Sequence, residues 1–322
     1  MVKRIGTLII TILLLSIIIF VAFSVLPGDA SLSKLGTDAS PERIEKLREE
    51  MGLHDPLPVR YLNWMKNAVH LDFGQSLQYT DVPVKDLIGQ RFGVTMILTC
   101  LSFLLILFIS YPLGVFCGRK QIKIKCLLWL RLVVDFLVRI TMAIPPFFLG
   151  ILITYLFGIT FRWFRPGDYV SPSEDFAACI WYLLFPAIAI ALPKSAMIIR
   201  FLSEAVKQES TKEYVRTAYS KGCSENRVFY GHILKNALIP TITFSALVLI
   251  DVIAGSLVIE QVFNVPGIGR LLVTAISNRD FPVVQGTVLL LAGFVVIANS
   301  AVDLMYRRLD PRTRVNTAKR KG

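Results

Sequence analysis

Six long apolar segments constrain this chain more than any other feature. A helix needs about 20 mostly apolar residues to cross the hydrocarbon core of a bilayer. The segments lie at residues 5–26, 92–117, 132–157, 178–199, 239–263 and 283–305. The chain is also 54% hydrophobic and only 18% charged, which is typical of an integral membrane protein. We therefore predict an all-α membrane protein with six transmembrane helices.

The first apolar segment has some features of a cleaved signal peptide. Lys3 and Arg4 precede it, and the sequence "PGDA" at residues 27–30 offers a weak cleavage site. However, the apolar run is longer than the roughly 7–15 residues of a signal-peptide core. We predict that this helix is retained.

The distribution of Lys and Arg predicts the orientation, because these residues are enriched in cytoplasmic loops. With the N-terminus inside, the inner segments contain 21 of them in 71 residues, and the outer segments contain 12 in 107 residues. The inner segments are then 1–4, 118–131, 200–236 and 307–322, and the outer ones are 27–94, 158–177 and 264–282. We expect a prokaryotic cell membrane (plasma or inner membrane) protein with both termini cytoplasmic. The net charge of +12 then reflects topology and contact with anionic membrane lipid, and nucleic acid is not an expected partner.

This topology predicts four parts. They are an N-terminal transmembrane helix (1–26), a small extracytoplasmic helical segment (27–91), a five-helix core (92–306) with a polar loop at 200–236, and a basic tail (307–322). The extracytoplasmic segment contains two helix patterns, at residues 40–52 and 58–69. The second has Leu62, Met65 and Val69 along one face, with Trp64 able to sit at the membrane interface.

The polar loop lies between two of the most apolar spans. Ser210 and Glu213 have the spacing of a capping box, which predicts a helix start. Gly222 interrupts the helical pattern, and we expect it to turn with a positive φ. Ser224 can then begin a second helix. The pattern alone leaves two interpretations open: the element rests in the lipid interface, or it docks on a soluble partner.

Several stretches of the sequence resemble one family of transport proteins. The loop contains "EYVRTAYSKG" followed by "HILKNALIP", and the resemblance extends over nearly the whole chain. The other matching stretches are "LIITILLLSIIIFVAFSVLPGD", "GLHDPLPVRYL", "DFGQSL", "ALPKSAMIIRFL", "IEQVFNVPGIGRLL", "RDFPVVQGTVLLL" and "VDLMYRRLDPRTR". Together they resemble the dipeptide/oligopeptide/nickel permeases of ATP-binding-cassette (ABC) importers, which implies a type I ABC importer permease fold.

The resemblance also implies a role for the loop as a coupling helix that docks in a groove of a cytoplasmic ATPase. The general permease motif begins Glu-Ala-Ala, whereas this chain has Arg-Thr-Ala at residues 216–218. The implied ATPase-coupling residues are Glu213, Arg216, Thr217, Ala218, Tyr219, Ser220, Lys221 and Gly222.

The function implied by the resemblance is that of one permease subunit, forming half of a translocation pathway for peptides or a related solute such as a nickel complex. The implied partners are a second homologous permease, two cytoplasmic ABC ATPase subunits and an extracytoplasmic solute-binding protein. ATP and Mg would be bound by the ATPase subunits, so we expect no cofactor in this chain.

Sequence motifs for other functions are absent. There is no P-loop motif, and the glycine-rich "PGIGR" at 266–270 lacks the third glycine of a dinucleotide site. The three histidines and five cysteines have no metal-site spacing, and no catalytic cluster stands out. A stand-alone secondary transporter or channel remains the alternative, and a membrane enzyme is disfavoured.

A few polar or helix-breaking residues interrupt the spans. An acid at the position of Asp251 costs about 2.5–3.5 kcal/mol in a bilayer, so we expect it to face water, protein or a solute. We expect Pro145 and Pro146 to break the third span and line a pathway with Asp251 and Lys194. For Lys194, snorkelling towards the interface and pairing with Asp251 are both open. The pairs Asp135/Arg139 and Asp303/Arg307 are expected to be structural.

Overall fold

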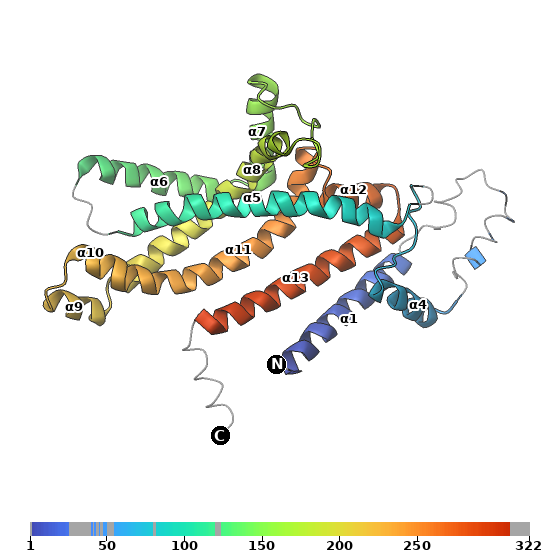
Figure 1. The fold of residues 1–322 in the computed structure, drawn as a ribbon, viewed down its shortest axis with the longest axis horizontal. Helices are drawn as coiled ribbons and strands as arrows, with labels where there is room; N and C mark the ends of the chain where they lie inside the picture. Colours follow the sequence, from blue (N-terminus) through green and yellow to red (C-terminus); the bar gives the residue numbers. More distant parts are fainter. Residues whose placement is uncertain are drawn as a thin grey trace. The chain divides into compact units, whose positions relative to one another are not determined.

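The computed structural model describes residues 2–25, 55–79, 82–119 and 124–309, with a few single positions between 40 and 49. Within these residues the regular elements are all helices, and the only strand-like feature is one isolated bridge between Gln75 and Pro83. The predicted helix at 40–52 and the tail beyond residue 309 lie outside the described residues. In chain order (Figure 1), the described elements are α1 (Val2–Val25), α4 (Leu57–Val69), α5 (Val84–Gly118), α6 (Lys125–Ala143), α7 (Pro146–Ile153), the π-helical η1 (Thr154–Thr160), α8 (Phe176–Glu209), α9 (Glu213–Ser220), α10 (Glu225–Val228), the π-helical η2 (Phe229–Leu234), α11 (Lys235–Val262), α12 (Ile268–Ser277) and α13 (Phe281–Leu309).

The predicted spans are found in these helices. Among the described residues, five helices are long and apolar enough to cross a membrane, and a sixth span is obtained if one bent helix pair counts as a single span. The five are α1, α5, α8, the continuous helix that ends in α11, and α13. The prediction of an all-α chain with six apolar spans is confirmed with the third span bent.

The bend in the third span follows from its two prolines. The helix pair Lys125–Ala143 and Pro146–Thr160 is bent by 105°. Pro145 has an extended backbone with ψ 139°, and Pro146 is the first residue of α7. A residue that precedes proline is disfavoured in the helical region, and proline is favoured at a helix start. The expected break at these prolines is confirmed.

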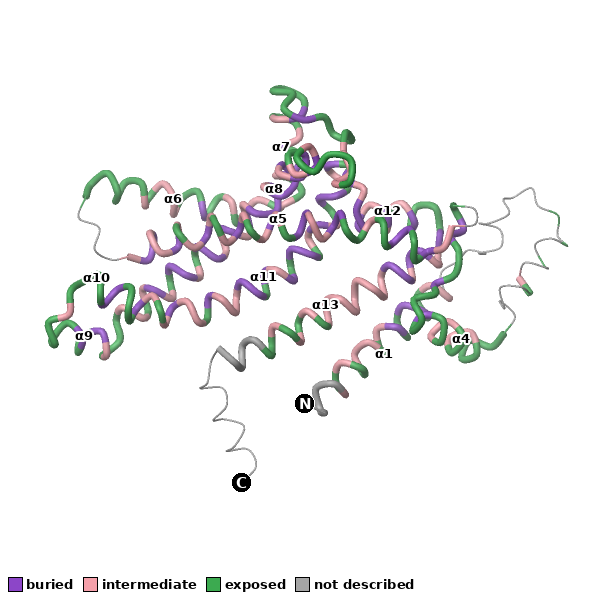
Figure 2. Tube along the Cα trace, viewed as in Figure 1, coloured by how far each residue is buried: buried purple, intermediate pink, exposed green. Residues whose placement is uncertain are grey.

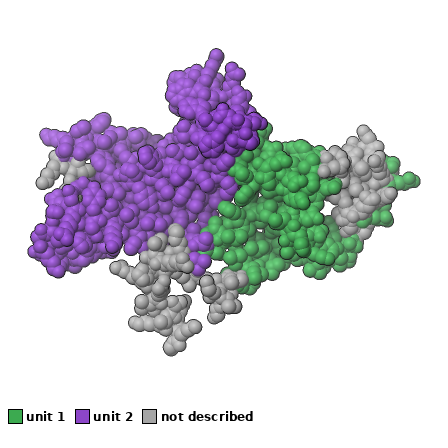
Figure 3. Space-filling model, in the orientation of Figure 1, with its two compact units in different colours: residues 1–95, 265–300 green, residues 96–264, 301–322 purple. Residues whose placement is uncertain are grey.

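The chain forms two compact units, drawn in different colours in Figure 3. The first contains residues 1–95 and 265–300, and the second contains residues 96–264 and 301–322. The division by packing does not coincide with the four topological parts expected from the sequence, which remain a prediction.

In the first unit, α4 packs against α1 through a face that the sequence pattern did not predict. Phe20 of α1 contacts the rings of Tyr61 and Trp64, at centroid distances of 5.5 and 5.7 Å. The Tyr61 hydroxyl also forms a 2.8 Å hydrogen bond with that of Ser16. By contrast, Leu62 and Val69 are exposed. The rings of Tyr61 and Trp64, and not the exposed Leu62 and Val69, thus form the contact with α1.

In the second unit, α8 is the most buried span and packs against α5, α6, α7 and α11. Two glycines one turn apart bring α5 close to it. A Cβ at Gly118 would lie 2.7 Å from the Cβ of Val206, and one at Gly114 would lie 2.9 Å from Cδ2 of Leu202. This small-xxx-small spacing permits close approach of membrane helices. It places the end of α5 beside the end of α8.

Candidate functional site: the α8–α11 connection and the groove beside it

The connection between α8 and α11, residues 210–234, begins with a residue that closes a helix. Ser210 is the C-terminal cap of α8, and its hydroxyl donates to the carbonyl oxygens of Val206 (2.6 Å) and Lys207 (3.0 Å). The expected capping box with Glu213 is therefore wrong. Lys212 is the N-cap of α9, because the hydroxyl of Ser210 is already committed to the preceding turn.

The turn that ends α9 matches the expectation for Gly222. This glycine has φ +76°, and a Cβ there would meet no atom within 4 Å. The amide of Gly222 donates to the carbonyl of Tyr219 (2.9 Å), and that of Cys223 donates to the carbonyl of Ala218 (3.2 Å). These two bonds form a Schellman motif, whose left-handed residue is usually glycine. The turn is therefore fixed by local backbone bonds.

Beneath α9 lies an apolar cluster, so that one side of the helix is buried and the other is exposed (Figure 2). The cluster joins α8, α9, η2 and the start of α11 through Leu202, Val206, Val215, Ala218, Val228, Phe229, Ile233 and Ala237. Of the eight residues expected to couple to an ATPase, Ala218 belongs to this cluster and Tyr219 is 42% exposed. The exposed face of α9 is formed by Glu213, Arg216, Thr217, Ser220, Lys221 and Gly222.

Polar side chains brace the connection at its entry. Glu209 at the end of α8 accepts from Lys212 (2.5 Å) and from the Tyr214 hydroxyl (2.6 Å). Asn236 of α11 in turn donates to the same hydroxyl (3.3 Å). These bonds tie the last turn of α8, the first turn of α9 and the first turn of α11 together.

A second brace comes from the end of α5. Arg119 donates to Asn226 Oδ1 at 2.7 Å, and its guanidinium lies 5.3 Å from the ring centroid of Phe229. Such a cation–π contact adds to the hydrogen bond. The backbone oxygen of Arg119 also accepts from Arg131 of α6 (3.3 Å). The sequence patterns did not indicate this role, because residues 119 and 226 are far apart in the chain.

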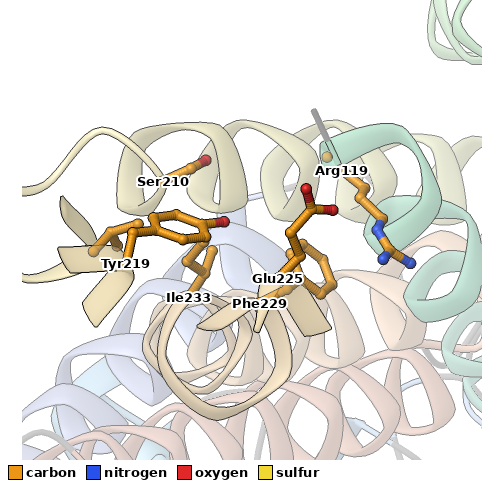
Figure 4. A pocket seen from close by; sticks show the side chains of 8 residues that line it. Arg119, Ser210, Tyr219, Glu225, Phe229 and Ile233 are labelled. Atoms are coloured by element: carbon orange, nitrogen blue, oxygen red, sulfur yellow. The ribbon is translucent and has the colours of Figure 1, made fainter. Parts of the chain in front are cut away.

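A small pocket of about 170 Å³ lies between the end of α5 and the connection. Figure 4 shows the side chains around it, including those of Arg119, Tyr219, Glu225 and Phe229. The pocket is therefore free volume next to α9 that the side chains of the apolar cluster beneath the helix do not fill.

The two charged residues expected in the spans are found together. Lys194 of α8 and Asp251 of α11 form a hydrogen-bonded ion pair. Pairing therefore replaces snorkelling as the account of Lys194. The Lys194 side chain is only 15% exposed, whereas that of Asp251 is 55% exposed. The pair thus has one open side, at the carboxylate.

The ion pair lies on a continuous surface of α8 and α11. Phe201 and Phe244, each seven residues from a member of the pair, stack with centroids 4.5 Å apart. On α11, the exposed positions from Leu247 onward recur every three or four residues and form one helical stripe, with Pro240 two turns before it. The stripe contains Leu247, Asp251, Ala254, Val258 and Gln261. The described helices of this chain leave the stripe uncovered.

Beside the stacked rings, a groove of about 410 Å³ continues towards the α8–α11 connection. It is lined by Met142, Met197, Arg200, Phe201, Glu204, Ala205, Gln208, Pro240 and Phe244. We call this surface, together with the ion pair, the α8–α11 groove. Charged residues are thus present at both ends of the groove. The prolines of the third span, residues 145 and 146, do not line its pocket.

One of the expected structural pairs is different in the structure. Asp135 lies 3.9 Å from the Nε atom of Arg131, one turn before it on α6. The expected pair with Arg139 is not formed among the described residues. Either neighbour satisfies the i,i+4 spacing, so the pattern did not decide between them. The side chain of Arg307, expected to pair with Asp303, lies outside the described residues.

The sequence analysis missed a buried anchor in the first unit. Asp280 is 1% exposed, and its carboxylate accepts from the Ser76 hydroxyl and from the amides of Leu77 (3.1 Å) and Gln78 (3.2 Å). The position directly before α13 was a usable signal, because Asp is favoured at a helix N-cap. Its partners some 200 residues earlier were not visible in the pattern.

These features define a class: a multi-pass helical membrane protein with a braced polar connection between two spans. The chain belongs to the family of binding-protein-dependent transport system inner membrane components. The family model matches residues 110–315, and a model of the N-terminal part of such components matches residues 1–99. The chain is therefore a permease subunit of an ABC importer. The family decides against a stand-alone transporter or channel.

Relatives match nearly the whole chain. A Brucella abortus (strain 2308) protein, whose name assigns it to a peptide transport system as a permease, is 36% identical over 312 residues, covering 97% of this chain and 98% of that protein. The oligopeptide transport system permease protein AppB of Bacillus subtilis is 33% identical over 300 residues, covering 92% of this chain and 93% of that protein. The crystal structure of an amino acid ABC transporter matches with a TM-score of 0.53 and 14% identity, over 69% of this chain and 94% of that one, which supports the fold.

Proposed function

We propose that this chain forms half of the translocation pathway of a peptide importer and is driven through α9 by an ATPase subunit. The Brucella and Bacillus relatives carry peptide or oligopeptide transport in their names. On this proposal the α8–α11 groove is part of the path of the solute. Half a pathway requires a second homologous permease to complete it.

The observation that carries the proposal is the position of α9. The helix is held before its first turn by the Glu209 bonds, and after its last turn by the Schellman motif at Gly222 and the Arg119–Asn226 brace. The helices before and after it, α8 and α11, also carry the groove. A force on α9 is therefore transmitted to both walls of the groove as a rigid-body movement.

The proposed assembly contains two ATPase subunits on the cytoplasmic side, which bind ATP and Mg, and a solute-binding protein on the other side. A binding-protein-dependent system implies partners of both kinds. The excess of Lys and Arg supports a cytoplasmic location for the α8–α11 connection and both termini. On the same basis the basic residues contact anionic lipid.

Single cysteines test the docking and the topology together. In a chain that lacks the five native cysteines, Ser220→Cys on α9 should form a cross-link with a co-expressed ATPase subunit. It should also be protected from an impermeant maleimide added to intact cells. Ser173→Cys, in the exposed loop before α8, is the matched control and should show the opposite behaviour. Labelling of Ser220→Cys from outside would overturn the proposed topology.

Transport is tested with the complete importer in proteoliposomes. We expect peptide uptake that requires ATP, the binding protein and both permeases. An importer that is loaded with peptide-bound binding protein and hydrolyses ATP, but moves no peptide, would overturn the proposed solute.

A further inference from the structure

The Lys194–Asp251 pair has unused capacity for hydrogen bonds on its open side. The ammonium group of Lys194 carries three N–H donors and the carboxylate of Asp251 accepts at two oxygens. Among the described residues, one bond between Nζ and Oδ2 is their only ion-pair contact. The carboxylate also lies on the exposed stripe of α11. The carboxylate of Asp251 can therefore bind a further charged group without breaking this bond, whereas the Lys194 side chain is 15% exposed and offers its other N–H groups only through that remaining surface.

The charges of the pair also restrict the net charge of a solute that can bind to it. The pair has no net charge, so a solute with a single charge leaves an excess charge in a site between two membrane helices. An uncompensated charge is costly where water is scarce. A zwitterion adds one positive and one negative group, and the four charges can then alternate in a closed ring. The geometry therefore favours a solute that carries both charges.

We propose that Lys194 and Asp251 form a binding site for short zwitterionic peptides within the pathway. The N-terminal ammonium of the solute binds the open side of Asp251, and its C-terminal carboxylate binds the remaining N–H groups of Lys194. This inference rests on the proposed function, because it assumes that the α8–α11 groove carries the solute.

The same geometry limits the length of the solute. The two charged groups of the site are in direct contact, so the two ends of the solute must lie within a few ångströms of each other. An extended peptide spans at most about 3.3–3.6 Å per residue, so the ends of a dipeptide are at most about 7 Å apart and those of an extended pentapeptide up to about 17 Å, which favours the dipeptide. The effect of the pair should therefore be large for dipeptides and small for pentapeptides.

The test compares initial rates of ATP-dependent uptake by the complete importer in proteoliposomes. A dipeptide with free ends is compared with its N-acetylated form and its C-terminal amide, each supplied as a saturating complex with the binding protein. Saturation removes differences in affinity for the binding protein from the comparison. We expect the wild-type importer to prefer the free dipeptide by about tenfold, equivalent to about 1.4 kcal/mol.

The decisive variant is Lys194→Met with Asp251→Asn, which removes both charges and leaves neither unpaired. We expect its preference for the free dipeptide to fall to about twofold or less, and Asp251→Glu to retain the wild-type preference. The control, Asp135→Asn, removes one carboxylate charge on α6 without touching the bond from Arg131 to Arg119, and should leave the preference unchanged. The free pentapeptide should show the same uptake in the wild type and the neutral variant.

An unchanged preference in the neutral double variant would overturn the inference while peptide import itself persists. The inference also fails if Asp251→Asn lowers abundance, Lys194→Met restores it, and the preference of the restored protein equals that of the wild type. Absence of peptide import by the wild-type complex would instead overturn the proposed function. The two failures are thus distinguishable.

Discussion

Two turns of this protein are built in opposite ways. The turn after α9 is closed by bonds between neighbours in the sequence, and a Cβ at Gly222 would meet open space. The loop at residues 76–78 is instead held by the buried carboxylate of Asp280, about 200 residues away. The first turn keeps its shape without contact from its exposed side, which suits a surface that docks on another protein. The second depends on the tertiary structure.

The largest effect is expected where the long-range anchor is removed. Asp280→Ala leaves the Ser76 hydroxyl and the Leu77 amide without their buried acceptor, whereas the amide of Gln78, an exposed residue, keeps its bond to the Ser76 hydroxyl oxygen (3.2 Å). Each unsatisfied buried donor costs about 1–3 kcal/mol, so we expect a loss of about 3 kcal/mol or more in stability. Thermal unfolding of the purified protein in detergent measures the loss.

The matched control for this variant is Asp72→Ala. The Asp72 carboxylate is exposed, and among the described residues it accepts one hydrogen bond, from the nearby amide of Gly74. The Asp72→Ala variant should lower the melting temperature far less than Asp280→Ala. Equal melting temperatures for the two variants would show that the loop does not depend on its distant partner.

A second variant tests whether the locally closed turn still needs support from distant parts of its unit. Gly118→Ala places a Cβ 2.7 Å from that of Val206, which belongs to the cluster beneath α9. Overpacking of this kind costs typically 1–3 kcal/mol, and we expect about 2 kcal/mol with reduced uptake. Gly93→Ala on the same helix meets no atom within 4 Å and should be neutral or stabilising. Wild-type stability of Gly118→Ala would mean that α5 and α8 separate at little cost.

A change in the local turn should destabilise the protein less than the two variants above, but should impair transport more. Gly222→Ala forces a side chain into a left-handed backbone, at about 1 kcal/mol. We expect normal abundance, weaker ATPase association and lower uptake. Gly222→Asn should recover part of the activity because Asn tolerates this conformation, and Gly231→Ala is a control at negative φ. Normal uptake by Gly222→Ala would remove the proposed role of the turn.

A similarly small effect on stability is expected at the Arg119 brace. Arg119→Met removes the hydrogen bond to Asn226 and the contact with Phe229, together about 1 kcal/mol. We expect less peptide transported per ATP hydrolysed, because α5 is no longer held to the α8–α11 connection when that connection moves. Arg227→Met, on the exposed side of α10, controls for loss of a positive charge. An unchanged ratio of transport to hydrolysis would restrict Arg119 to a structural role.

The same contrast explains which predictions succeeded. The spans, the proline break and the positive φ of Gly222 depend on runs of apolar residues or on the backbone preferences of single residues. These are local properties, and the structure confirms them. The family was also visible in the sequence, because its motifs are contiguous stretches, and the comparisons confirm it.

The failed predictions concern side chains with several possible partners. Ser210 had the spacing of a capping box but closes α8, and Asp135 pairs with Arg131. In each case the local pattern permitted more than one arrangement, and packing against another segment selected one.

The sequence by itself thus determined the membrane-spanning helices, the break in the third span, the turn at Gly222 and the family. Only the tertiary structure decided that Lys194 meets Asp251, that Asp280 holds the loop at residues 76–78, and that Arg119 reaches Asn226. The physical reason is the range of the interactions. Backbone preference and hydrophobic run length act within a few residues, whereas a buried charge or donor must find its partner wherever folding brings one within hydrogen-bond distance.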